Sequence, residues 1–233
     1  MIVFDNVVLR YPYDEVDVLK GVSFTLQQGL NTVLADAQSG KSSICKLLVK
    51  DVSATSGQIF VDGQPISSIT NSNLDILYLP SNPTFFERRS VQYNLEYPLI
   101  VRKIRKDERH KRAISVAQQF GLDVGVKARS LTVAQRRTLA LARGLTVTRK
   151  VVLFDGFFDS CLDNGAPDFQ YINSVLQQFD MERTTCVILT SNKAIAMGNT
   201  VVLDGGKVVF CGDAAAAQQQ VDSLHWLVNV IKE

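Results

Sequence analysis

The sequence has no uninterrupted apolar run of about 18 residues, the length that a membrane-spanning helix requires. Its opening segment, MIVFDNVVLR, also lacks a basic stretch followed by an apolar one, so we expect no export signal. The chain is therefore expected to have no membrane anchor of its own, and any association with a membrane would be peripheral.

Histidine and cysteine are scarce, and their positions do not favour a zinc site. The two histidines, His110 and His225, lie far apart in the sequence, and no two cysteines form a C-x-x-C pair. Every cysteine stands in an apolar stretch, so we expect buried, reduced thiols, as in a cytosolic protein. The cysteines are Cys45, Cys161, Cys186 and Cys211.

A large excess of one charge is also missing, because 25 Lys and Arg balance 23 Asp and Glu to a formal net charge of +2. No whole-chain field therefore attracts nucleic acid or anionic lipid. The exception is local: residues 102–112, RKIRKDERHKR, hold seven Lys and Arg against two acidic residues. No aromatic residues are interleaved for base stacking, so we expect a solvated helix here and no nucleic-acid partner.

What is present is an ordinary globular composition, with 46% hydrophobic and 21% charged residues in a chain of 233. Apolar, β-branched segments predict strands, whereas helical periodicity follows residue 41 and prevails over 87–148. Asp62-Gly63 and Gly205-Gly206 predict hairpin turns. This order of elements indicates an α/β core with a helical subdomain. The predicted strands and hairpins cover 2–11, 18–29, 30–36, 57–66, 74–80, 151–155, 184–192 and 199–212, and a closing helix covers 214–232.

The sharpest local motif is ADAQSGKS at residues 35–42, which matches the phosphate-loop template G-x-x-x-x-G-K-S/T except at its first glycine. Backbone N–H groups and the following helix N-terminus would cradle phosphate, Lys41 would contact the β- and γ-phosphates, and Ser42 would coordinate Mg²⁺. A Gly-Lys-Ser turn that opens a helix by chance is the alternative, but the strand–loop–helix setting favours phosphate binding. The predicted contacts are Ala35, Asp36, Ala37, Gln38, Ser39, Gly40, Lys41, Ser42 and Ser43.

Beyond this loop, the chain resembles the ATP-binding-cassette (ABC) ATPases over nearly its whole length. Residues 131–145, LTVAQRRTLALARGL, resemble the family signature LSGGQRQRVALARAL, and Asp155 ends the apolar strand VVLFD at the family's spacing. Tyr11-Pro12 before VLKGVSF is similar to the loop that stacks on adenine, and SVQYNLEYPL at 90–99 is similar to the segment after the Q-loop. LDGGKVVFCG at 203–212 resembles the family's closing hairpin.

The resemblance implies an α/β P-loop NTPase fold of the ABC type, as one domain over residues 1–233. The RecA-like core would span about 1–86 and 149–233 with an antiparallel β piece, and the helical subdomain about 87–148. The implied cofactors are ATP and Mg²⁺: Tyr11 would stack on the adenine, and Ser42 and Asp155 would hold the metal.

Four departures from the family pattern remove catalytic groups. Gly156 stands where the family has its catalytic Glu, Ser81 where it has the Q-loop Gln, and Ser191 where it has the switch His. The signature Ser-Gly-Gly is replaced by Thr132-Val133-Ala134, whose β-branched valine would hinder approach to a phosphate on a partner subunit. Since a positioned general base contributes about 10²–10⁴-fold in rate, we expect Mg-ATP binding with poor or no hydrolysis.

The loop 156–163 offers two further carboxylates. Phe157 replaces the family's proline, and the loop is one residue longer than usual in the family. Asp159 could supply a substitute carboxylate, but a loop or helix-cap role is the expectation. Asp163 matches an aspartate of the family that contacts the other subunit.

Together these features predict a nucleotide-binding subunit with a structural or regulatory role, docked on a separate membrane permease from the cytoplasmic side. A homo- or heterodimeric ABC partner is expected, with a heteromer favoured because both composite sites are damaged. An active ABC ATPase that energises transport is the first alternative, and a soluble ABC protein acting on nucleic acid or ribosomes is the second. Aromatic residues that could receive a permease, or pack in the core instead, are Phe85, Phe86, Tyr93 and Tyr97.

Overall fold

The computed structural model describes residues 1–36, 38–70, 73–147 and 149–223. The chain divides into two compact units, Met1–Ser81 together with Lys150–Glu233, and Asn82–Arg149. The division falls a few residues from the boundaries expected from the sequence, because the chain leaves the first unit directly after the strand that ends at Pro80. Each unit has its own core and is described separately.

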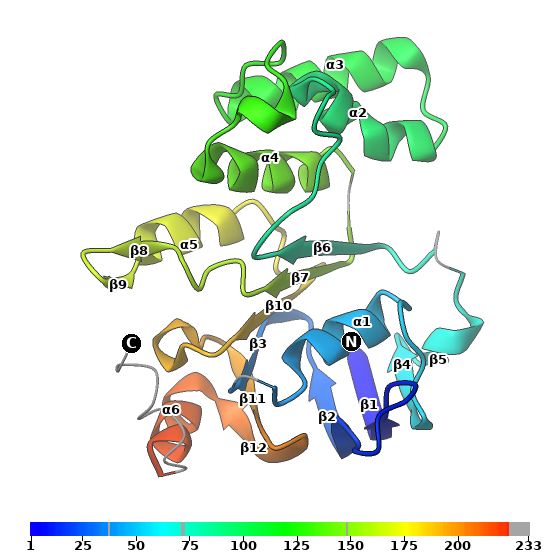
Figure 1. The fold of residues 1–233 in the computed structure, drawn as a ribbon, viewed down its shortest axis with the longest axis vertical. Helices are drawn as coiled ribbons and strands as arrows, with labels where there is room; N and C mark the ends of the chain where they lie inside the picture. Colours follow the sequence, from blue (N-terminus) through cyan, green and yellow to red (C-terminus); the bar gives the residue numbers. More distant parts are fainter. Residues whose placement is uncertain (37, 71–72, 148, 224–233) are drawn as a thin grey trace. The chain divides into compact units, whose positions relative to one another are not determined.

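The first unit contains a six-stranded, mostly parallel sheet in the order β12-β11-β3-β10-β7-β6 (Figure 1). The neighbouring strands β10 and β7 are almost entirely buried, which explains their continuous apolar sequences TCVILT and VVLFD. Only β12 among these strands runs antiparallel, as the return of a hairpin with β11. The strands are β3 (Gly29–Ala35), β6 (Ile76–Pro80), β7 (Val151–Asp155), β10 (Thr185–Thr190), β11 (Asn199–Asp204) and β12 (Lys207–Asp213).

A second, antiparallel sheet in the same unit has the order β2-β1-β4-β5. Its strands alternate buried and exposed residues, as expected for a sheet with one face on the core. Asp62-Gly63 connects β4 to β5, at the hairpin turn predicted from the sequence. The strands are β1 (Ile2–Leu9), β2 (Leu19–Leu26), β4 (Ser56–Val61) and β5 (Gln64–Pro65).

Helix α1 (Lys41–Leu48) lies between the two sheets, and one hydrophobic core joins all three elements. Ile44 of α1 shares that core with Phe4 of β1 and Leu153 of β7. A separate cluster around Val202 attaches helix α6 (Ala214–Ser223) to the sheet. The predicted closing helix is therefore described as far as Ser223, and its remainder lies outside the described residues. The other elements of this unit are α5 (Phe169–Leu176), the short pair β8 (Leu162–Asp163) and β9 (Ala166–Pro167), and the 3₁₀ turns η1 (Ile66–Ser68) and η3 (Lys193–Ile195).

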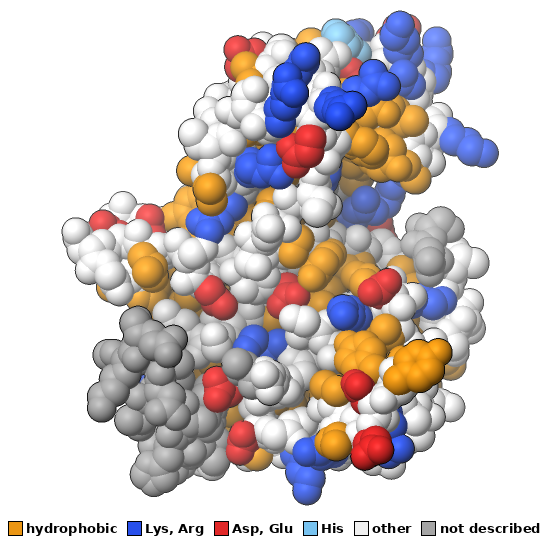
Figure 2. Space-filling model, viewed as in Figure 1, with side chains coloured by type: hydrophobic (Ala, Val, Ile, Leu, Met, Phe, Trp, Pro, Cys, Tyr) orange, Lys and Arg blue, Asp and Glu red, His pale blue; other side chains and the backbone are white. Residues whose placement is uncertain are grey.

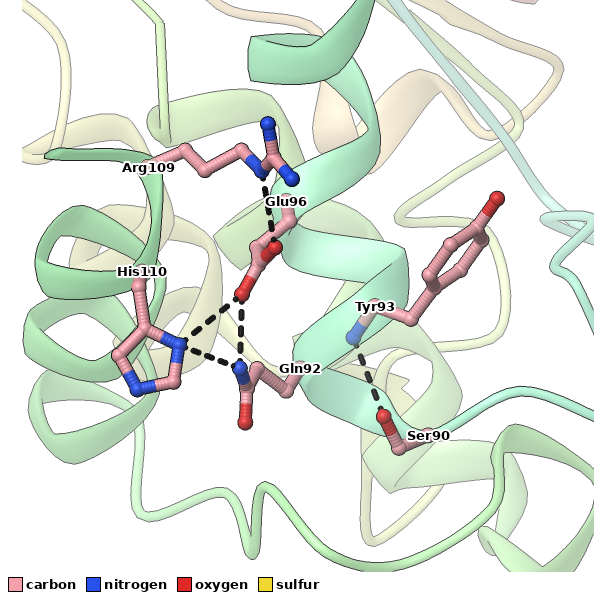
Figure 3. Close-up of polar contacts among 6 residues, drawn as sticks. All are labelled: Ser90, Gln92, Tyr93, Glu96, Arg109 and His110. Atoms are coloured by element: carbon pink, nitrogen blue, oxygen red, sulfur yellow. Dashed lines mark hydrogen bonds and ion pairs between the residues drawn. The ribbon is translucent and has the colours of Figure 1, made fainter. Parts of the chain in front are cut away.

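The second unit consists of α2 (Val91–Val101), α3 (Lys106–Gln119), η2 (Ala128–Ser130) and α4 (Val133–Leu145) around a small core of apolar side chains. Figure 3 shows a polar contact between α2 and α3, in which Glu96 accepts hydrogen bonds from Arg109 at 3.2 Å and Gln92 at 2.7 Å. His110 lies 3.3 Å from the same carboxylate. Although burial opposes the effect, these partners lower the pKa of Glu96.

The basic segment 102–112 follows α2 and includes the first half of α3, and Lys and Arg side chains gather over this part of the surface (Figure 2). Most of its residues are exposed, as a solvated helix requires. Arg112 pairs with Glu108 and Arg109 with Glu96, so part of the positive charge is neutralised inside the unit.

One expectation about the cysteines is wrong. Cys45, Cys161 and Cys186 are buried free thiols, but Cys211 is exposed. Cys211 belongs to β12, which lies at the edge of the sheet and alternates exposed and intermediate residues, so an apolar sequence neighbourhood there does not imply burial. Among the described residues, no helix is both long and apolar enough to cross a bilayer.

Candidate functional site

The site predicted from the sequence lies at the carboxyl ends of the central parallel strands, the usual position for ligands in such sheets. In the sheet register, Leu34 of β3 is paired with Thr190 of β10, and Asp155 of β7 is paired with Leu189 of β10 on one side and Pro80 of β6 on the other. The residues that follow these positions therefore emerge along one edge of the sheet. The topology brings the phosphate loop, Asp155, Ser81 and Ser191 to that edge.

The phosphate loop connects β3 to α1 and has the backbone of an anion-binding turn. Gln38 and Gly40 have positive φ angles of 65° and 98°, and the Ser39 N–H donates to the Asp36 carbonyl oxygen at 3.3 Å. No side chain caps the N-terminus of α1. The first N–H groups of the helix thus remain available to a phosphate. Ala37, a predicted contact, lies outside the described residues.

Glycine is required at position 40 by packing as well as by its φ angle. A Cβ atom added there would be 2.6 Å from the Leu19 Cδ2 atom, closer than carbon atoms approach without a shift. The residue lies in the left-handed region, which L side chains rarely adopt. Gln38 also has a positive φ angle, which costs an L residue about 1 kcal/mol.

Lys41 folds back on its own loop. Its Nζ atom donates to the carbonyl oxygens of Ala35 and Asp36. Burial lowers the pKa of the Lys41 ammonium, and the negative charges of Asp159, Asp36 and Asp155 act in the opposite direction. The ammonium is therefore held at the mouth of the loop by neutral carbonyl oxygens, which phosphate oxygens could replace.

Tyr11 is brought to the start of α1 by the fold. Its hydroxyl lies 3.0 Å from the Ser43 hydroxyl, and the Lys46 ammonium lies 5.2 Å from the centre of the ring. A base could therefore stack on only one face of Tyr11, because Lys46 covers the other. Ser42, the neighbouring residue of the helix, is exposed, as a metal-coordinating hydroxyl must be.

Asp155 has a partner that sequence reasoning missed. The Tyr78 hydroxyl donates to Asp155 Oδ2 at 2.9 Å, and burial together with this hydrogen bond raises the pKa of Tyr78 well above its usual value. Alternation along the strand 76–80 places Tyr78 on the same face as Pro80, but only the sheet register pairs Pro80 with Asp155, so the sequence alone does not identify this contact.

Ser42 and Asp155 fit Mg²⁺ by their chemistry. Among the described residues there is no group of three His, Cys, Asp or Glu side chains that could form an all-protein metal cage. Mg²⁺ commonly takes one or two protein oxygen ligands and completes its shell with phosphate and water. A hydroxyl and one carboxylate are therefore a sufficient donor set.

Three positions that depart from the family pattern surround a carboxylate. A Cβ atom added to Gly156 would be 3.4 Å from the Ser81 Cβ atom and 3.5 Å from Asp159 Oδ2. Asp159 Oδ1 accepts a hydrogen bond from the Thr190 hydroxyl, and the Ser191 backbone also bonds to this carboxylate. Asp159 is thus a loop residue, as its sequence position suggested, and its partly buried carboxylate also makes hydrogen bonds within the site.

The environment of Asp159 is mixed. Burial raises the pKa of its carboxyl group, the hydrogen bond from Thr190 and the charge of Lys41 lower it, and Asp155 raises it again. The net direction is upward. The site therefore contains two carboxylates and one ammonium, from Asp155, Asp159 and Lys41, at the carboxyl edge of the sheet.

The segment Thr132-Val133-Ala134 belongs to the second unit. Thr132 caps helix α4, and its own backbone N–H donates to Gln135 Oε1 at 2.9 Å, which completes a capping box. Val133 is the first residue of the helix and is 70% exposed. A β-branched side chain therefore stands in the first turn of α4, at a position where the family signature has a glycine.

A hollow of about 600 Å³ lies in another part of the first unit. Val151 and Thr185 line it, and these are the first residues of β7 and β10. It therefore lies at the amino ends of the strands, opposite the phosphate loop. The geometry of the phosphate loop, and not the size of this hollow, indicates the nucleotide site.

Comparisons with known proteins identify the family and the fold of this chain. A family model described as ABC transporter matches residues 19–158, more than half of the chain. A solved dimeric ATP-binding cassette in a post-hydrolysis state, bound to ADP and Pi, has a TM-score of 0.78 and 21% identity and covers 92% of this chain and 99% of its own.

Two further solved structures are similar. A bacterial Atm1-family ABC exporter with ATP bound has a TM-score of 0.76 at 22% identity, over 94% of this chain and 40% of that one. CbiO1 from Clostridium perfringens, part of the ABC transporter complex CbiONQ, has a TM-score of 0.76 at 20% identity, over 96% and 92%. At these identities the structural likeness establishes the fold.

Proposed function

The chain belongs to the ABC transporter family as one of its ATP-binding subunits, and from this premise we propose that it binds Mg-ATP but hydrolyses it weakly at most. Its role is then structural or regulatory, with the bound nucleotide as a gate. The observation that carries the proposal is the phosphate loop, in which an uncapped helix N-terminus and Lys41 point to one place.

The residues proposed to contact the nucleotide all belong to the first unit. Backbone N–H groups of Ser39, Gly40 and Lys41 would bind phosphate oxygens, and the Lys41 ammonium would exchange its carbonyl partners for them. Tyr11 would take the adenine on its free face. Mg²⁺, held by Ser42 and Asp155, would neutralise charge on the phosphates.

The weakness of hydrolysis is argued from the groups near the expected γ-phosphate. Gly156 has no side chain. The side chains of Ser81 and Ser191 are shorter than the glutamine and histidine that the family has at these positions. Val133 places a β-branched side chain at the first position of α4, where the family signature has a glycine. Losing one positioned donor or base costs about 10²-fold or more in rate, and several are lost together.

A separate integral-membrane permease is the proposed partner, with this chain bound from the cytoplasmic side. The second unit exposes aromatic surface that fits a docked apolar segment: Phe86 is 40% exposed and Tyr97 is 38% exposed, with ring centres 4.5 Å apart. A heteromeric pairing with a more intact ABC subunit is favoured, since this chain cannot complete a fully equipped composite site.

The test is an equilibrium titration of the purified chain with Mg-ATP by isothermal calorimetry. We expect micromolar binding, weakened about 10- to 100-fold by Lys41→Ala, because one charge-assisted contact to phosphate is lost. Lys207→Ala removes an exposed lysine of β12 and serves as the matched control. Wild-type protein that binds no nucleotide at millimolar ATP would refute the proposal.

A further inference from the structure

The Asp159 carboxylate lies among the three positions from which polar side chains have been lost. The added Cβ atom at Gly156 would be 3.5 Å from Asp159 Oδ2 and 3.8 Å from the Ser81 hydroxyl oxygen. A backbone hydrogen bond connects Asp159 to Ser191. One carboxylate therefore occupies part of the space that three longer side chains would otherwise share.

The distance of this carboxylate from residue 156 matches the reach of a glutamate side chain. In a glutamate, each carboxylate oxygen lies roughly 3 to 3.5 Å from its own Cβ atom, because two C–C bonds and one C–O bond separate them. Asp159 Oδ2 lies 3.5 Å from the Cβ position of residue 156. The oxygen thus stands at the distance from this backbone position that a glutamate's own carboxylate would have.

The carboxylate is held by contacts that fix its orientation. Thr190 Oγ1 donates to Asp159 Oδ1 and itself accepts the Asn192 N–H at 2.9 Å. The Asp159 N–H donates to the Gly156 carbonyl oxygen at 3.2 Å, which closes a tight turn after β7. Thr190 therefore binds Oδ1, whereas Oδ2 is the oxygen that lies near Gly156.

Buried aromatic residues anchor the turn. Phe157 and Phe158 are 0% and 1% exposed and pack against Phe154 of β7, with ring centres 5.8 Å and 4.9 Å apart. Both phenylalanines leave the site for the core. The next residue, Asp159, is thereby directed back toward Lys41, whose positive charge acts to lower the pKa of the Asp159 carboxyl group.

We propose that Asp159 is a substitute general base, which carries whatever ATP hydrolysis the chain retains. The inference rests on the proposed binding of Mg-ATP. Asp159 Oδ2 accepts a hydrogen bond from a water molecule lying between Gly156 and the γ-phosphate. The two positions emptied by Gly156 and Ser81 supply the space for that water.

The step balances as an ordinary hydrolysis. The water oxygen forms a bond to the γ-phosphorus while the bond from phosphorus to the β–γ bridging oxygen breaks, and that oxygen leaves on ADP with the electron pair. The water gives one proton to the Asp159 carboxylate, which releases it to solvent after phosphate has formed. Lys41 stabilises the negative charge on the transferred group.

The experiment is single-turnover hydrolysis of radiolabelled Mg-ATP with the protein in excess and above its Kd, with Lys41→Ala defining the background and calorimetry giving the affinity of each variant. We expect slow hydrolysis by the wild type above that background. Asp159→Asn should lower the rate about 10²-fold or to background and leave the affinity within a few-fold. Asp5→Asn, which neutralises an exposed carboxylate of β1, should change neither quantity.

Chemical rescue distinguishes a base from a structural residue. In Asp159→Gly, added formate should restore part of the rate in proportion to its concentration, and chloride at equal ionic strength should not. Two results would overturn the inference while leaving nucleotide binding intact: a wild-type rate equal to that of Lys41→Ala, or an Asp159→Asn rate equal to the wild type. Failure of the wild type to bind Mg-ATP would instead refute the proposed function itself.

Discussion

Replacing Gly156 by glutamate returns a carboxylate to the position after Asp155, and the structure predicts that this change destabilises the protein without producing rapid hydrolysis. Gly156 has a φ angle of 61°, a conformation that costs an L residue about 1 kcal/mol. The added Cβ atom meets no steric obstacle, since its nearest neighbours are 3.4 Å and 3.5 Å away. Gly156→Ala should therefore lose about 1 kcal/mol in the free energy of unfolding, from the backbone alone.

Gly156→Glu adds electrostatic repulsion to this backbone cost. Its carboxylate would lie near that of Asp159, and two like charges about 4 Å apart repel by roughly 4 kcal/mol at an effective dielectric constant of about 20. Part of this repulsion is relieved when one of the two carboxylates binds a proton or when the introduced side chain rotates toward solvent. We expect a total loss of about 2–3 kcal/mol at pH 8, and about 1 kcal/mol for the double variant Gly156→Glu with Asp159→Asn.

The sign of the pH dependence follows from proton binding. The carboxylate pair holds an extra proton in the folded state, so its pKa is raised and the folded state binds more protons than the unfolded state. The stability of Gly156→Glu should therefore fall as the pH rises above the ordinary carboxyl range, relative to Gly156→Ala. Urea denaturation of the wild type and the three variants at pH 6 and pH 8 measures this, with Mg-ATPase assays in parallel.

The reasoning would be refuted if Gly156→Glu were as stable as Gly156→Ala at both pH values and hydrolysed ATP many-fold faster without a change at Asp159. That result would place the Asp159 carboxylate away from the space that a glutamate at 156 needs. It would also remove the geometric basis for Asp159 as the substitute base.

Two further predictions concern stability. Tyr78→Phe removes the hydrogen bond to Asp155 and should cost about 1 kcal/mol, because the hydroxyl is partly exposed. The raised pKa of Tyr78 favours its neutral form in the folded state, so wild-type stability should be retained below about pH 10 and fall above it; urea denaturation from pH 8 to 11 should show that Tyr78→Phe lacks this loss. Asn31→Ala deletes a buried side chain of β3 that bonds to backbone atoms of Gln27, Gly29 and Cys186, and should cost about 3 kcal/mol. The exposed control Asn173→Ala should change stability by less than about 0.5 kcal/mol in the same assay, and equal losses would contradict the assigned role of Asn31.

Much of the fold was predictable because its signals are local. The apolar runs of β7 and β10, the Asp62-Gly63 turn and the phosphate loop between a strand and a helix each depend on residues close together in the chain. Cys211 shows where local reasoning fails: its neighbours are apolar, but its strand lies at the edge of the sheet. The position of a strand in a sheet is not encoded in its own sequence.

The candidate site was predictable in part for the same reason. Lys41, Ser42 and Asp155 stand in motifs that identify them by spacing. Tyr78 and Asp159 do not, since Tyr78 meets Asp155 across two strands, and Asp159 depends on the direction of a turn fixed by buried aromatic rings.

The sequence by itself determined the family, the phosphate loop and the loss of the usual catalytic side chains, because these are properties of residue identity at fixed spacing. Only the tertiary structure decided what fills the space left by those losses. The pairing of β6, β7 and β10 brings Ser81, Gly156 and Ser191 together, and the turn after β7 places the Asp159 carboxylate among them. Distances across a sheet depend on strand order and on core packing, and neither can be read from the order of residues along the chain.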